Sequence, residues 1–200
     1  MRGAFNIMYG YAKNRRDFDQ EAYNKNDASG KQTAEQLILY LNKNQQDIIK
    51  KFFGSTKDLT VYKVENKKYG DLLLEFDMTN HQLCEVEVRS SHNFDGNWFK
   101  NGNYSSGINI PKKPDLKNSN GIYLSFSQIE VNNFIEKGYL PKRFIIIQTE
   151  VIKTCPLEAP PSKNGSPTDI KNNDYKYKVP HEQAYKFEWD DKTEKYLLKK

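Results

Sequence analysis

The sequence lacks most of the features that mark membrane, secreted and zinc-binding proteins. It has two cysteines, Cys84 and Cys155, which give neither a disulfide framework nor a zinc-ligand spacing. Its three histidines share no spacing typical of metal ligands. No apolar run approaches the length of a membrane span, and the amino terminus lacks the apolar core of a signal peptide. We therefore expect a soluble, intracellular, cytoplasmic protein with no membrane partner.

Apolar residues are also scarce, whereas aromatic residues are not. The hydrophobic fraction of the 200 residues is 36% and the aromatic fraction is 13%, which is enough to pack the core of one domain. Lysine and arginine exceed the acidic residues, giving a formal net charge of +5 and a pI near 8.9. This excess is a mild bias toward polyanionic partners.

The stretch from Gly70 to Arg89 carries the clearest local pattern. Apolar and charged residues alternate on both sides of a turn, which predicts an antiparallel hairpin with strands at 71–77 and 83–89. Acidic residues are depleted in strands, so a divalent cation, or solvent with nearby lysines, must offset their repulsion here. The charged face is formed by Asp71, Glu75, Asp77, Glu85, Glu87 and Arg89.

The alternation requires odd-numbered residues of one strand to pair with odd-numbered residues of the other. One register that obeys this rule pairs Glu75 with Glu85, and Asp71 with Arg89. Glu87 then lies diagonal to Asp71, at about 7–8 Å between backbones. Two carboxylates so placed suit Mg²⁺, a hard cation that prefers oxygen ligands and keeps several waters.

Two helices are predicted from capping patterns. Thr33 with Gln36 forms a capping box and predicts a helix over 34–53, ended by Gly54. A second capping box at Ser127 predicts a helix to about residue 137. Residues 1–30 have no sustained period and are interpreted as loop or short helix.

Alternation and β-branched runs predict further strands at 59–64, 121–126 and 143–151. A hairpin near the carboxyl end is expected from the alternation of Tyr185, Phe187 and Trp189. Between these elements, residues 90–120 form a long irregular stretch, in which prolines limit pairing to an edge strand.

These elements predict an α/β (α+β) fold with a mixed central sheet flanked by helices. We expect a core domain over residues 1–155, with its elements recognisable from 33 to 151. A linker rich in proline, serine and asparagine follows at 156–174, and a β-hairpin tail at 175–200.

The order helix, three strands, helix, strand, with an acid on the second strand and Glu87-x-Arg89 on the third, resembles the PD-(D/E)XK nuclease superfamily. The resemblance covers roughly residues 33 to 151 and implies a restriction-endonuclease-like αβββαβ core. It implies that Asp71 and Glu87 bind Mg²⁺ or Mn²⁺ and that the chain hydrolyses DNA phosphodiester bonds. Glu35 would match an accessory metal-binding acid, although in the first turn of its helix it also suits the helix dipole. Glu85 would be a further catalytic acid.

The sequence departs from the family pattern at two positions. Gly70 precedes Asp71 where the family has proline, and Arg89 stands where it has lysine. Arginine cannot act as a base but can stabilise a transition state. Some members of the superfamily carry the lysine elsewhere, and Lys112 or Lys113 are the candidates here.

The long stretch after the hairpin mixes aromatic residues with lysines, a combination that can stack bases and neutralise phosphates. We expect Trp98 to pack onto the sheet instead. The candidate nucleic-acid-binding residues are His92, Lys100, Lys113 and Lys117.

Two other functions remain open alongside a DNA endonuclease. The chain could be a non-catalytic nucleic-acid-binding protein on the same fold, its acids merely solvated. It could also be a structural or assembly protein that uses its aromatic tail for contacts. The oligomeric state is open too, a homodimer included.

Overall fold

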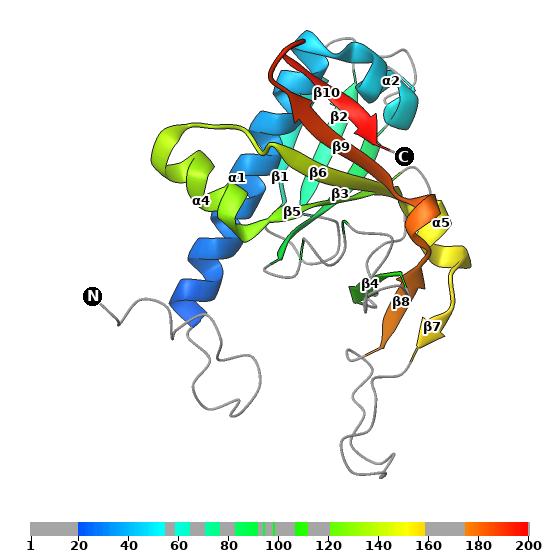
Figure 1. Cartoon of the computed structure of the whole chain (residues 1–200). Coiled ribbons are helices and arrows are strands. Elements are labelled where there is room, and N and C mark those ends of the chain that lie inside the picture. The colour runs from blue at the N-terminus through cyan, green and yellow to red at the C-terminus, as the bar shows by residue number, and fades with distance from the viewer. Residues whose placement is uncertain are drawn as a thin grey trace.

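In the computed structural model, the described residues are 20–54, 59–64, 71–76, 83–91, 94, 98, 107–111, 121–158 and 175–199. They form a mixed α/β structure in which helices pack against a large sheet, as the sequence predicts (Figure 1). None of the described helices combines the length and the apolar character that a membrane crossing requires.

The large sheet has seven strands in the spatial order β1-β2-β3-β5-β6-β9-β10. Neighbouring strands are antiparallel except β3 and β5, which run parallel. The predicted carboxyl-terminal hairpin is confirmed as β9 and β10, and it extends this sheet because β9 pairs with β6. The strands are β1 Leu59–Lys63, β2 Leu72–Phe76, β3 Leu83–Ser91, β5 Ile122–Ser127, β6 Arg143–Gln148, β9 Tyr185–Asp190 and β10 Lys195–Lys199.

The first helical region differs from the prediction in both its start and its continuity. A long helix, α1, spans Gln20–Asn44, and a separate helix, α2, spans Gln46–Phe53. Thr33 is therefore not a cap: it lies inside α1, where its hydroxyl donates to the carbonyl oxygen of Ser29 at 2.8 Å. The amino-terminal part of α1 extends beyond the sheet (Figure 1).

The second predicted helix is confirmed as α4, Gln128–Lys137. The Ser127 hydroxyl accepts from the Glu130 N–H at 3.2 Å, as the capping box requires, and Gly138 ends the helix. The strand expected over 143–151 is too long, because β6 ends at Gln148 and the helix α5 begins, spanning Thr149–Thr154. A continuous β-branched run does not by itself distinguish a strand from a short helix.

Two apolar clusters lie on opposite faces of the large sheet. Residues of α1, α2 and α4 pack on the face that carries Leu72, Cys84 and Val86. On the other face, α5 and a small sheet pack against Tyr123 and Ile145. The small sheet has the order β4-β8-β7, with β4 Ile108–Pro111, β7 Leu157–Glu158 and β8 Lys176–Val179. Its proline-containing strand β4 is at an edge, as predicted.

The break between α1 and α2 joins the helices to the last strand. Gln45 has a non-helical backbone (φ −140, ψ 59). Its side-chain amide accepts from the Tyr196 N–H at 2.7 Å and donates to the Tyr196 carbonyl oxygen at 3.0 Å. The amide thus forms the two hydrogen bonds that a neighbouring strand would form with this residue of β10.

We predict that Gln45→Ala lowers the free energy of unfolding by about 1–3 kcal/mol, because two hydrogen bonds are lost. Urea denaturation measures the effect. Gln36→Ala, at an exposed position of α1, is the control and should change stability by less than about 0.5 kcal/mol. Equal stability of the two variants would contradict the role of Gln45.

Gly107 lies where the chain enters β4 and approaches β8 closely. Its φ is +110, and a Cβ atom there would lie 2.5 Å from the Val179 carbonyl oxygen. At Gly30, inside α1, a Cβ atom would meet its nearest neighbours, on Ser90 and Val88, at 3.9 and 4.0 Å, which are ordinary contacts.

The two glycines therefore predict alanine substitutions of opposite sign. Gly107→Ala should destabilise the protein by about 2 kcal/mol or more, because of strain and a backbone clash. Gly30→Ala should stabilise it by about 0.5–1 kcal/mol, because alanine favours a helix interior. Thermal unfolding of both variants tests this prediction. Stability changes of the same sign in the two variants would contradict it.

Candidate functional site

The register of β2 and β3 differs from the predicted one by two residues. Glu75 lies opposite Leu83, and Leu73 lies opposite Glu85, so the expected pairing of Glu75 with Glu85 is wrong. A slip of two residues keeps every side chain on its predicted face. The alternation therefore specifies the apolar face correctly but not the pairing.

Continued by one residue beyond the start of β2, the observed register would place Asp71 opposite Glu87 rather than diagonal to it. Leu72 pairs with Val86, and Asp71 is one residue earlier while Glu87 is one residue later. Glu85 and Glu87 lie on the face away from α1, and their exposed fractions are only 6% and 5%. Burying two carboxylates costs free energy unless charges and donors around them compensate.

Asp71 is held by two different elements. One carboxylate oxygen, Oδ2, accepts from the backbone N–H of Val88 at 2.8 Å. The other, Oδ1, lies 3.3 Å from Nζ of Lys31, which comes from α1. The Asp71 side chain, just before β2, thus accepts a backbone hydrogen bond from β3. Through its ion pair with Lys31 it also connects α1 to this end of the sheet.

Lys31 is the site residue that the sequence analysis missed. Its side chain is 19% exposed, and its Nζ also lies 2.9 Å from Oδ2 of Asp27, one turn earlier in α1. Burial acts to lower the pKa of Lys31, but the hydrogen bond to Asp27 and the charge of Asp71 outweigh it and raise the pKa. The one sequence signal is an acid four residues before a lysine, which matters only once a helix is assigned there.

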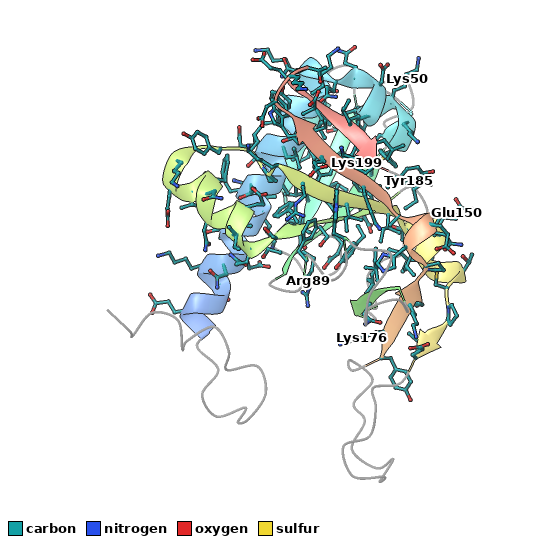
Figure 2. All side chains as sticks on the ribbon, viewed as in Figure 1. Lys50, Arg89, Glu150, Lys176, Tyr185 and Lys199 are labelled. Atoms are coloured by element: carbon teal, nitrogen blue, oxygen red, sulfur yellow. The ribbon has the colours of Figure 1, made fainter. Side chains whose placement is uncertain are left out.

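Arg89 and Tyr123 complete the charged face. In the pairing of β3 with β5, Glu87 lies opposite Tyr123, and Arg89 lies opposite Ser125. Burial raises the pKa of Tyr123; the charge of Arg89 opposes this rise, and the charges of Glu87 and Asp71 add to it. Tyr123 therefore lies close enough to Asp71, Glu87 and Arg89 for their charges to affect its pKa. Figure 2 shows the Arg89 side chain projecting from the lower end of the sheet.

The other predicted site residues have different surroundings. Glu35 pairs with Lys63 of β1 at 2.8 Å, through Oε2 and Nζ. Trp98 packs against the apolar cluster beside Phe94, with 5.7 Å between ring centroids, as predicted. Five predicted residues lie outside the described ones: His92, Lys100, Lys112, Lys113 and Lys117.

The carboxylates of Asp71 and Glu87 are of the ligand type that a divalent cation such as Mg²⁺ prefers. No group of three or more histidine, cysteine, aspartate or glutamate side chains in the described part of the chain is placed to hold a metal ion. Mg²⁺ needs only one or two protein carboxylates and takes its other ligands from water and substrate. A carboxylate offers about four lone-pair positions, so Asp71 retains some beyond its contacts with Val88 and Lys31.

Comparison of the chain with protein families, curated proteins and solved structures finds no match.

We predict that Asp71→Ala lowers the free energy of unfolding by about 1–3 kcal/mol, because the Val88 N–H loses its acceptor. Asp71→Asn should cost less, since its amide oxygen can still accept that bond and Lys31 keeps its ion pair with Asp27. Urea denaturation of both variants makes the comparison. Equal losses would mean that the hydrogen bond to Val88 contributes nothing measurable.

Proposed function

We propose that this chain is a Mg²⁺-dependent DNA endonuclease that hydrolyses phosphodiester bonds, a divergent relative of the PD-(D/E)XK nucleases. The observation that supports this best is the contact of Asp71 with β3, where Asp71 Oδ2 accepts from the N–H of Val88, the neighbour of Glu87, at 2.8 Å. Lys31 lies 3.3 Å from Asp71, and Arg89 is on the same strand as Glu87. The two acids could hold a metal ion, and the two cationic side chains could bind the negatively charged phosphate of a substrate.

The strand topology agrees with the resemblance in one respect and departs from it in another. An antiparallel run β1-β2-β3 follows the helices α1 and α2, as the resemblance implies. Among the described elements, however, the helix α4 follows β5 instead of lying between β3 and β5.

Asp71 and Glu87 would hold the Mg²⁺ or Mn²⁺ ion, with Glu85 on the same face of β3 as Glu87. When bound, such an ion lowers the pKa of a coordinated water and stabilises charge on a phosphate. Lys31 and Arg89 would bind and orient the phosphate. Arginine offers two parallel donors to phosphate oxygens, and the raised pKa of Lys31 keeps its ammonium charged.

In this assignment, Lys31 of α1 supplies the ammonium group that the family's motif lysine would supply. Arg89 occupies the strand position of that lysine, and Lys31 supplies an ammonium from α1. Neither residue is a proton acceptor at neutral pH, so their contribution is electrostatic. The net charge of +5 favours association with DNA, since the phosphate backbone attracts basic proteins irrespective of sequence.

We predict DNA cleavage that requires Mg²⁺ or Mn²⁺ and stops on addition of EDTA. Glu87→Gln should lower the cleavage rate on the order of 100-fold or more, because the charge that would hold the ion is lost. Nicking of a supercoiled plasmid measures the rate. Circular dichroism should show the variant folded.

Glu188→Gln is the matched control, since Glu188 lies on β9 and pairs with Lys199 at 3.0 Å through Oε2 and Nζ. Its cleavage rate should equal that of the unmodified protein. Cleavage by Glu87→Gln at the unmodified rate would contradict the assigned role of Glu87.

A second candidate function is nucleic-acid binding without catalysis. Two observations favour it: arginine replaces the motif lysine, and both oxygens of Asp71 already contact groups of the chain itself. Binding to DNA that weakens steeply with salt, with no cleavage under any divalent cation, would support this candidate over the endonuclease.

A further inference from the structure

Lys31 lies between two carboxylates from different parts of the fold. Its Nζ is 2.9 Å from Oδ2 of Asp27 in α1 and 3.3 Å from Oδ1 of Asp71 at the sheet. We propose that Asp27 is a positioning residue of the candidate site, which holds the Lys31 ammonium beside Asp71 where a substrate phosphate would bind. This inference rests on the proposed nuclease function.

The helix geometry explains why Asp27 can do this. Side chains of a helix lean toward its amino terminus, so Lys31 leans over the turn that carries Asp27. An acid four residues before a lysine is also the more favourable orientation of such a pair. The side chain of Lys31 contacts Asp27 at 2.9 Å and Asp71 at 3.3 Å, so Asp27 helps to set its direction.

A lysine that stabilises a phosphate must be both charged and fixed. A free lysine side chain has many rotamers, and a single ion pair at a surface fixes it only weakly. Two carboxylates from different elements, as at Lys31, restrict it more.

Asp27 itself is the most exposed of the three groups. Its side chain is 41% exposed, against 19% for Lys31 and 14% for Asp71. Its task differs from that of Asp71, because Asp27 pairs with a lysine of its own helix, whereas Asp71 also accepts a hydrogen bond from the backbone of β3. Loss of Asp27 should therefore affect the orientation of the ammonium and leave the β2–β3 hairpin intact.

The experiment compares Asp27→Asn with Asp27→Glu, which retains the carboxylate. Asp27→Asn should lower kcat for DNA cleavage about tenfold, as loss of a supporting residue typically does, while KM stays within about twofold. Asp27→Glu should restore most of kcat. In a Lys31→Met background, Asp27→Asn should have no further effect, because the two residues act as one unit.

Asp191→Asn is the matched control. Asp191 also pairs with a lysine, Lys142 at 3.6 Å, but both side chains are largely exposed and neither belongs to the candidate site. Its kcat and KM should equal those of the unmodified protein.

A second readout does not depend on cleavage. Acylation of lysines, followed by mass spectrometry, reports how accessible and how firmly held each ammonium is. Lys25, an exposed lysine of the same helix, is the internal reference. We expect Lys31 to react several-fold more slowly than Lys25 in the unmodified protein, and Asp27→Asn to remove most of this difference.

The outcomes separate the two proposals. Cleavage by the unmodified protein with unchanged kcat in Asp27→Asn would overturn the role of Asp27 and leave the endonuclease standing. Unchanged acylation of Lys31 in Asp27→Asn would overturn it as well, whatever the cleavage rate. A protein that cleaves no DNA with any divalent cation would end both proposals together.

Discussion

The carboxylate of Asp71 is the contact on which the candidate site depends. It satisfies the Val88 N–H where β2 begins, and it pairs with a lysine of α1. The buried N–H of Val88 needs an acceptor, and the partly buried ammonium of Lys31 needs a negative charge nearby. The Asp71 carboxylate provides both. The position of the helix relative to the sheet is thereby coupled to the position of the acid, and Lys31 contacts Asp71 although the two residues belong to different elements.

The sequence predicts the strands of this protein better than their pairing. Alternation along the β2–β3 hairpin identifies the apolar face correctly, with Cys84 buried on it. The register stays undetermined, because a shift by two residues preserves both faces. That shift decides whether Glu87 is diagonal to Asp71 or opposite it. The carboxyl-terminal hairpin and the helix capped by Ser127 were predictable, since local alternation and capping specify them directly.

The start of α1 and the role of Lys31 could not be predicted, for one shared reason. Residues 21 and 24–29 are exposed or only partly buried, and no apolar period in the sequence marks this stretch as helix. The capping-box pattern at Thr33 then offers a false start. Tertiary packing begins near Gly30, which lies close to Val88 and Ser90 of β3, and the helix continues outward from there. The local sequence of Lys31 offers only the acid four residues before it, and that spacing is informative only after a helix has been assigned.

Gln45 has a consequence for how copies of this protein can associate. The outer edge of a sheet exposes unpaired N–H and C=O groups, which can recruit a strand from another molecule and lead to aggregation. At Tyr196 of β10 these groups are already occupied by the Gln45 amide. A strand from a neighbouring copy would have to displace that amide before it could pair with β10 at this residue. The interruption between α1 and α2 therefore also opposes edge-to-edge association of the sheet at β10.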